Sequence, residues 1–384
     1  MKKILFTLLW VKLSIFLIII FAYNLLPFAG LNHFANFTYP AHEKISLKTA
    51  FKTWDAQHYL FLSEKGYKPN IDSDRFFPLL PILINLLTFI TRNSVFSGLL
   101  LSNVASFIGF YFFYRFVEIL TQSEKIAFLS SILLLAFPTS FYFSLIYSES
   151  ILFLLTTGFF YFLIKNQLGK ASLFSFFIPL ARPTGLFIIL PFFSYLLLKT
   201  IGKSENKKTN KSWWKVKIDK SIILLFMPIA GFISYLLFMQ LSTGNAFTGI
   251  AMQNVVVGKW SVTNLFHPEI FIKNFIFTPL SIHGFTDSLI DRIFFIISIL
   301  SLPIIYKKTG FVLFVYCLPI FAVPLLGSFM AYTRYMLMGF PIFIAAGIVI
   351  SNKKYEPLLY PILAFSISLQ CLFLIMHSLN YWVS

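Results

Sequence analysis

The chain has 384 residues, of which 58% are apolar, 19% aromatic and only 12% charged. Soluble domains carry roughly 25% charged and 45–50% apolar residues, so the composition excludes soluble enzymes, disordered proteins and disulfide-rich secreted domains. The formal net charge is +17, but its lysines lie mainly between apolar runs, as membrane topology requires. We therefore predict one all-α, multi-pass membrane domain over 1–384, with no nucleic-acid partner.

Apolar runs follow one another along the chain. The first covers 4–26 after Lys2 and Lys3, which predicts an uncleaved anchor with its N-terminus inside. Further runs lie near 96–119, 126–145, 150–164, 171–199, 221–241, 289–306, 309–326, 335–351 and 357–376. Because a span needs ~20 apolar residues, we predict about eleven membrane-crossing segments and a C-terminus outside.

The apolar run 76–91 decides between two topologies. If it spans the bilayer, three later lysines face outward: Lys125, Lys165 and Lys170. The run has about 16 residues, short of the ~20 of a span, and it contains Pro78 and Pro81. We therefore predict that it lies in the interface, within a first extracytoplasmic loop over 27–91, and that the three lysines lie inside.

This topology fixes the other connections. The run 171–199 becomes two half-helices that meet at Ala181-Arg182-Pro183, a break that is tolerated only where it lines a cavity. The Lys-rich segment 199–220 is predicted to be a cytoplasmic loop that can lie on anionic lipid. The segment 242–288 is predicted to be a second extracytoplasmic loop.

Two carboxylates stand out from their surroundings. Asp55 lies near the start of 54–65, whose apolar spacing predicts a short helix along the membrane surface. Glu149 lies between two strongly apolar segments, where a charge is costly and commonly functional. The alternative for Asp55 is a role as the N-cap of the helix. The alternative for Glu149 is packing beside a lysine or Ser148.

Arg182 is a candidate phosphate-binding residue, because a guanidinium group matches phosphate oxygens; its alternative is a structural ion pair with Glu149. Asp72-Ser73-Asp74 resembles a metal-binding DxD motif, but we favour a solvated turn there. Neither the histidines nor Cys317 and Cys371 show metal-ligand spacing. We predict no metal and no other cofactor.

An ordered series of motifs resembles the PIG-V mannosyltransferases. The matching residues are Thr53-Trp54-Asp55-Ala56-Gln57-His58-Tyr59 with Gly66-Tyr67, Arg75-Phe76-Phe77-Pro78-Leu79-Leu80-Pro81, Phe137-Pro138-Thr139-Ser140, Tyr147-Ser148-Glu149-Ser150, Leu180-Ala181-Arg182-Pro183-Thr184-Gly185 and, more weakly, Tyr332-Thr333-Arg334-Tyr335. The resemblance implies a GT-C glycosyltransferase fold with its active site in the first extracytoplasmic loop. It also implies that the donor is a polyprenyl-phosphate sugar and that this sugar is mannose. Asp55 matches the family's catalytic aspartate.

If the sugar is transferred from such a donor with inversion, each remaining candidate residue has an expected role. Asp55 removes the proton of the acceptor hydroxyl, and cationic side chains stabilise the leaving phosphate. The predicted substrate-binding residues are Trp54, His58, Tyr59, Arg75, Tyr147, Glu149, Arg182 and Arg334. The predicted partners are the donor lipid, a glycolipid or glycan acceptor, and the bilayer of the cell membrane.

Two other classes of function fit parts of the pattern. A flippase or transporter of lipid-linked sugars also has broken helices and intramembrane charges, but here the candidate residues cluster after the first span instead of in two matching halves. A structural scaffold predicts that loss of the Asp55 charge costs only a helix cap.

Overall fold

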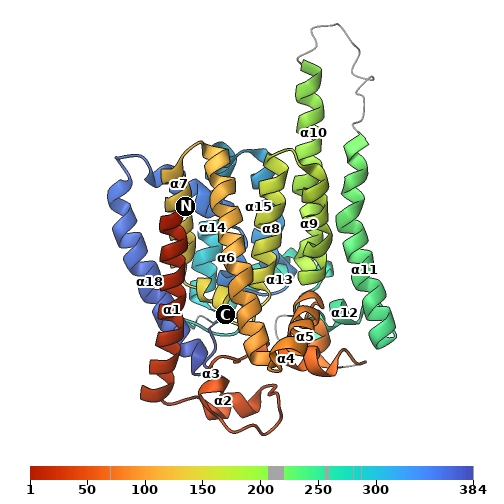
Figure 1. Cartoon of the computed structure of the whole chain (residues 1–384), viewed down its shortest axis with the longest axis vertical. Helices are drawn as coiled ribbons and strands as arrows, with labels where there is room; N and C mark the ends of the chain where they lie inside the picture. The colour runs from red at the N-terminus through yellow and green to blue at the C-terminus, as the bar shows by residue number, and fades with distance from the viewer. Residues whose placement is uncertain (70, 206–219, 256–258, 280, 287, 384) are drawn as a thin grey trace.

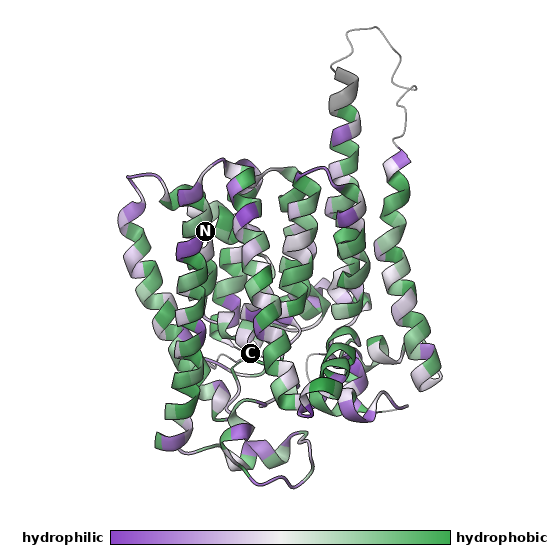
Figure 2. Cartoon of the chain, viewed as in Figure 1, coloured by the Kyte–Doolittle hydropathy of each residue, from purple (hydrophilic) through white to green (hydrophobic). Residues whose placement is uncertain are grey.

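The computed structural model shows a bundle of helices (Figure 1). It describes residues 1–69, 71–205, 220–255, 259–279, 281–286 and 288–383. These residues contain helices and no β-strand, which confirms the predicted all-α fold. Apolar residues predominate along the long helices (Figure 2), as expected for helices that face hydrocarbon.

Six helices in the described ranges are long and apolar enough to cross a membrane. They are α1 (Lys2–Leu25), α6 (Ser94–Thr121), η3 with part of α10 (Pro183–Ile201), η5 with α11 (Lys220–Thr243), α14 (Leu289–Thr309) and η9 with α18 (Glu356–Ser378). Shorter apolar helices accompany them. The chain is therefore a multi-pass membrane protein. The number of crossings, about eleven at ~20 residues each, stays a prediction.

Three segments contain a turn between two helical parts, and the first two start at the upper end in Figure 1 and turn back inside the bundle. They are α7 (Glu124–Ala136) with α8 (Glu149–Ile164), α9 (Leu168–Ala181) with η3 (Pro183–Ile188) and α10 (Ile189–Glu205), and α15 (Phe311–Phe321) with α17 (Pro341–Ile350). The 13 residues of α7 rise only ~20 Å, less than the ~30 Å hydrocarbon core. The turns therefore lie at membrane depth.

Prolines mark these turns. Arg182 has an extended backbone (φ −156°, ψ 154°) between α9 and Pro183, because a residue before proline is disfavoured in a helix. The predicted break is confirmed. The predictions of single segments over 126–145 and 335–351 were wrong, since Pro138 follows the end of α7 and Pro341 begins α17. The first of these turns contains η2 (Ser140–Ser144), and α16 (Tyr332–Met336) precedes α17.

Polar side chains satisfy the backbone of the turn after α7. Gln370 Nε2 donates to the carbonyl oxygens of Leu135 (3.0 Å) and Phe137 (2.9 Å). Lys12 Nζ donates to the Phe143 carbonyl oxygen and to Ser144 Oγ, both at 3.1 Å. Unpaired backbone groups are costly at membrane depth, so α1 and α18 stabilise a turn that a lipid-facing chain could not form.

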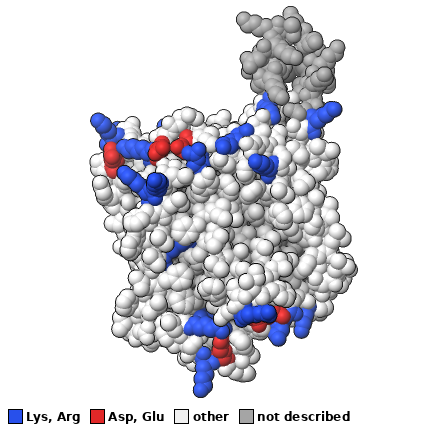
Figure 3. Space-filling model, in the orientation of Figure 1, with Lys and Arg blue, Asp and Glu red and all other residues white. Residues whose placement is uncertain are grey.

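The two ends of the bundle differ in charge. The end that holds the N-terminus also holds the α6–α7 and α8–α9 connections (Figure 1). Lys125, Lys165 and Lys170 lie in or next to these connections, and we call this end the basic end. Charged side chains gather near the two ends of the visible face, with an almost uncharged band between them (Figure 3). The three lysines thus lie at the same end as the N-terminus, as the favoured topology expects. Which membrane face this end occupies stays a prediction.

The first loop lies at the opposite end of the bundle. It contains α2 (Gly30–Ala35), α3 (Leu47–Ala50), α4 (Asp55–Lys65), η1 (Asp72–Arg75) and α5 (Leu79–Thr91). Helix α5 packs against α4 and α6 at this end and does not reach the basic end (Figure 1). The run 76–91 therefore does not cross the bundle from end to end, and its position in the membrane interface stays a prediction.

The segment 242–288 is more structured than the predicted polar loop. It includes α12 (Thr248–Val255), η6 (Val262–Phe266), α13 (Pro268–Ile272) and η7 (Lys273–Phe277). Helix α12 approaches η1 so closely that a Cβ at Gly249 would lie 2.7 Å from the Asp74 carbonyl oxygen, so glycine is required there. Of the predicted basic loop 199–220, residues 206–219 lie outside the described residues.

Aromatic rings fill the bundle between the three turns and the basic end. Phe153 packs on Phe110 and Phe340 with ring centroids 4.9 and 6.3 Å apart, and Phe160 lies 5.7 Å from Phe340. All four side chains are buried. This set of rings, which we call the phenylalanine core, accounts for part of the high aromatic content without any cofactor.

Candidate active site

A cavity of about 710 Å³ lies where the first loop, the break after α9, the α12–η6 region and α16 meet. Its volume is within the ~300–1,000 Å³ of typical ligand pockets. It is lined by seven of the nine predicted site residues: Trp54, Asp55, His58, Tyr59, Arg75, Arg182 and Arg334. The fold thus gathers residues from the first loop and from two of the membrane-depth turns.

Asp55 is the first residue of α4 and its side chain is 25% exposed. The residue before it, Trp54, has φ 55° and ψ −124°, a backbone conformation that is costly for a non-glycine residue and is often found at functional sites. Asp55 Oδ2 accepts a hydrogen bond from Arg334 Nη1 at 2.6 Å. The N-cap alternative for Asp55 is wrong, because Trp54 occupies that position.

Four charged side chains form a continuous chain of ion pairs. Arg334 contacts Asp55 through Nη1 and Glu149 Oε1 through Nε. Glu149 Oε1 also accepts from Arg182 Nη2 at 2.7 Å. Glu149 is fully buried, and the Arg334 and Arg182 side chains are 7% and 10% exposed. Alternating charges compensate one another, which buried ions require.

The rings of Tyr142 and Tyr147 pack against the guanidinium group of Arg334. The Arg334 guanidinium lies 4.9 Å from the ring centroid of Tyr142 and 4.6 Å from that of Tyr147, a cation–π arrangement. The Tyr147 hydroxyl donates to the Thr53 carbonyl oxygen at 3.1 Å, two residues before Asp55. Tyr147 and Glu149 are absent from the cavity wall, so their contacts position Arg334 and the start of α4.

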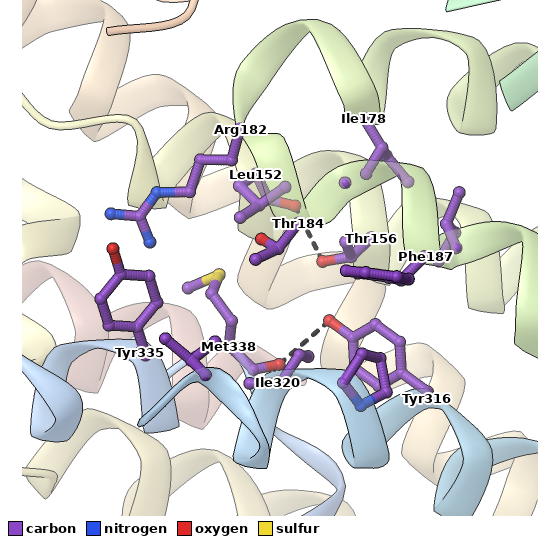
Figure 4. A pocket seen from close by; sticks show the side chains of 14 residues that line it. Leu152, Thr156, Ile178, Arg182, Thr184, Phe187, Tyr316, Ile320, Tyr335 and Met338 are labelled. Atoms are coloured by element: carbon purple, nitrogen blue, oxygen red, sulfur yellow. Dashed lines mark hydrogen bonds between the residues drawn. The ribbon is translucent and has the colours of Figure 1, made fainter. Parts of the chain in front are cut away.

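Arg182 lies between Glu149 and the cavity. Its guanidinium is 5.1 Å from the ring centroid of Tyr335, and the two side chains face each other in Figure 4. Arg182 Nη1 has no hydrogen-bond partner within the described residues. The structure therefore shows the ion pair with Glu149 and, on the same side chain, a buried donor without a protein partner in the described part of the chain.

His58 is sandwiched between aromatic rings beside Arg75. Its ring stacks on Phe37 and Phe76 at centroid distances of 4.2 and 4.7 Å, and its Nδ1 lies 2.8 Å from Ser73 Oγ. Burial, together with the positive charge of Arg75, lowers the pKa of His58 to about 3. The imidazole is therefore neutral at physiological pH.

The Asp72-Ser73-Asp74 motif does not present two carboxylates to one point. Asp72 lines the cavity, whereas Asp74 is buried and its Oδ2 accepts from the Ile71 amide at 3.4 Å. Within the described ranges no group of three His, Cys, Asp or Glu side chains is arranged to hold a metal ion.

The charge of Arg334 controls the ionisation of Asp55. Burial favours the neutral acid, but the Arg334 guanidinium outweighs burial and holds the pKa of the Asp55 carboxyl below its ordinary value. Asp55 is thus a carboxylate at neutral pH and stays one into the acidic range. We expect Arg334→Gln to raise this pKa, so that the acid limb of the kcat/KM profile moves to higher pH. An unchanged acid limb in initial-rate measurements would contradict this coupling.

The family described as mannosyltransferase (PIG-V) matches residues 3–286. The chain belongs to this family. The family is the one that the motifs predicted. The match includes Asp55, Glu149 and Arg182 but ends before Arg334, which the fold brings to the same site. No curated protein matches the chain significantly.

Solved structures of similar shape include an oligosaccharyltransferase of Archaeoglobus fulgidus, with a TM-score of 0.49 and 10% identity over 97% of this chain and 53% of that one. Another is the archaeal oligosaccharyltransferase AglB of the same organism, in complex with an inhibitory peptide and a dolichol-phosphate, with a TM-score of 0.45, 12% identity and coverages of 100% and 56%. The chain spans about half the length of these proteins.

Proposed function

We propose that this PIG-V family member is a GT-C-type glycosyltransferase that moves mannose from a polyprenyl-phosphate donor to a hydroxyl of a glycolipid or glycan. The reaction takes place at the cavity, on the extracytoplasmic face of the cell membrane, with inversion at the anomeric carbon. The observation that carries the proposal is the chain of ion pairs, which has a cavity-facing carboxylate at one end and a cavity-facing arginine at the other.

Asp55 is the proposed base. As the acceptor oxygen forms its bond to the anomeric carbon, Asp55 accepts the hydroxyl proton, and the bond between that carbon and the phosphate oxygen breaks. A base in hydrogen-bond reach contributes about 10²–10⁴-fold to the rate. Arg334 keeps Asp55 ionised and fixes its orientation through the 2.6 Å contact.

Arg182 is the proposed phosphate-binding residue, with Arg75 as a second cation on the cavity wall. The breaking bond leaves its electron pair on the phosphate, so preorganised donors that face this charge lower the barrier. Arg182 Nη1 supplies an unused donor, and its other nitrogen, Nη2, is held by Glu149. A guanidinium fixed in this way loses little freedom when phosphate binds.

A narrow apolar slot of about 30 Å³ lies next to Arg182. It adjoins the cavity at residues common to both, Arg182, Thr184, Val323 and Tyr335, and runs between α8, η3 and α15 (Figure 4). Its apolar wall includes Ile178, Phe187, Ile188 and Ile320.

The proposal is tested with the purified protein in proteoliposomes, supplied with radiolabelled polyprenyl-phosphate mannose and a panel of glycolipid and glycan acceptors. We expect a new mannosidic bond of inverted configuration and no transfer from a nucleotide-linked mannose. Transbilayer movement of the donor lipid without a new bond would instead identify a flippase and contradict the proposal.

Arg182→Met is expected to lower kcat by about 10²–10³-fold, the usual cost of removing one preorganised donor to a developing negative charge. Arg182→Lys should recover only part of this loss, because an ammonium lacks the guanidinium fork. Initial rates against donor concentration measure both effects. Arg115→Met is the control, since Arg115 pairs with Glu118 outside the cavity; equal rates in both Met variants would exclude Arg182 from the reaction.

A further inference from the structure

Three aromatic rings from distant parts of the sequence meet on the cavity wall beside Asp55. Trp382 stacks on Phe285 with ring centroids 4.2 Å apart, and Trp54 meets both rings edge-on at 5.2 and 6.0 Å. All three residues line the cavity. We call them the aromatic triad. Phe285 and Trp382 gave no signal in the sequence, because nothing local marks them among many aromatic residues.

The triad is held in place by the surrounding backbone. Trp54 Nε1 donates to the Tyr381 carbonyl oxygen at 3.2 Å, and the Tyr381 amide donates to the Met376 carbonyl oxygen at 2.9 Å. The segment that carries Phe285 is fixed to α18 by His283, whose ring stacks on Phe373 at 5.0 Å. The rings are therefore a preformed surface, and Phe285 remains 40% exposed.

The triad is placed on the side of the site where an acceptor is needed. Inversion requires the acceptor oxygen to approach the anomeric carbon from the face opposite the leaving phosphate. Arg182 and Asp55 are the two ends of the chain of ion pairs, separated by Glu149 and Arg334. Trp54 directly precedes Asp55, so the triad adjoins the end of the chain that is away from the proposed phosphate site.

The chemistry of the triad indicates a neutral sugar ring. Phosphate binds best to the cavity arginines, whereas a pyranose presents one face of C–H groups that packs on an aromatic ring while its hydroxyls stay hydrated. Aromatic side chains offer a large, rigid surface with little entropy to lose on binding. We propose that the aromatic triad is the acceptor subsite and binds a pyranose ring of the acceptor. This inference rests on the proposed function and names the substrate class at one side of its site.

Binding of octyl α-D-mannopyranoside to the protein in nanodiscs without glycolipids tests the proposal. Wild-type protein is expected to bind this glycoside, and n-octanol, which has the same chain and no sugar, is expected to bind much more weakly. Trp382→Ala and Phe285→Leu should each weaken binding by about tenfold or more, the scale of one lost ring contact. Trp382→Phe retains a ring and should bind nearly as wild type, which separates stacking from misfolding.

Tyr381→Ala is the matched control. Tyr381 is the aromatic neighbour of Trp382 and is absent from the cavity wall, and its carbonyl oxygen, which accepts from Trp54, survives the substitution. This variant should bind octyl mannoside as wild type does. The subsite is overturned if wild-type protein does not bind the glycoside, if octanol binds equally well, or if Trp382→Ala and Phe285→Leu match Tyr381→Ala.

A second pair of variants separates this proposal from the reaction chemistry. Asp55→Asn and Arg182→Met should both lose transfer, whereas Arg115→Met, outside the cavity, should keep transfer and wild-type affinity for octyl mannoside. If Asp55→Asn retains full transfer while the triad variants still lose glycoside binding, the proposed base is wrong and the sugar subsite stands. If the triad variants bind normally while Asp55→Asn is inactive, the subsite alone fails.

Discussion

Replacing Asp55 with Asn is expected to lower mannosyl transfer by about 10²–10⁴-fold, the contribution of a positioned general base. Asparagine has the same shape and can still accept a hydrogen bond from Arg334 Nη1, but it cannot take up the acceptor proton. The loss should appear in kcat, with the donor KM little changed. Single-turnover assays with polyprenyl-phosphate mannose in proteoliposomes measure this difference.

The matched control is Asp72→Asn. Asp72 is a carboxylate on the same cavity wall, but it takes no part in the chain of ion pairs. It should retain most of the wild-type rate. A thermal unfolding midpoint of Asp55→Asn close to that of the wild type would show that the fold is intact. If Asp55→Asn turns over normally, or Asp72→Asn loses as much activity, Asp55 is not the base.

Removing Glu149 is expected to have the largest effect on stability. Glu149→Ala would leave two arginines, Arg182 and Arg334, in a buried region without the carboxylate that both contact. Breaking a buried ion pair by deleting one partner costs about 3–5 kcal/mol, because the remaining charge is uncompensated. The loss should appear as a lower thermal midpoint in detergent, together with loss of transfer.

Two comparisons show whether charge is the cause. Glu149→Gln keeps an acceptor oxygen for the arginines and should lie between wild type and Glu149→Ala. Glu118→Ala removes the partner of Arg115, whose side chain is 35% exposed, and such pairs contribute only about 0–1 kcal/mol. Equal midpoints for Glu149→Ala and Glu118→Ala would refute a structural role for the buried chain.

Local chemistry made part of this site predictable from sequence. The break at Arg182 follows from the proline after it, which acts on the residue directly before it. The failure of 76–91 to span the bundle follows from its length and its prolines. The short helix after Trp54 is visible in its apolar spacing. Each of these features is decided within a few residues.

Features that depend on distant contacts were not predictable. Arg334 reaches Asp55 across 279 residues, and sequence spacing does not show that these charges meet. Tyr147 was predicted to bind substrate from the family motif and Glu149 from its charge between apolar segments; the structure places both against Arg334 and outside the cavity wall. The triad residues Phe285 and Trp382 become notable only when the fold brings them beside Trp54.

The phenylalanine core restricts how substrates reach the cavity. Phe110, Phe153, Phe160 and Phe340 pack between the half-depth turns and the basic end, and a hydrated sugar cannot cross such a layer without losing its water shell. The proposed donor and acceptor would then both enter from the end that holds α4 and α5, or sideways from the adjoining leaflet. If the donor is the lipid-linked sugar proposed above, its sugar must already be at that end of the bundle before this protein can act on it.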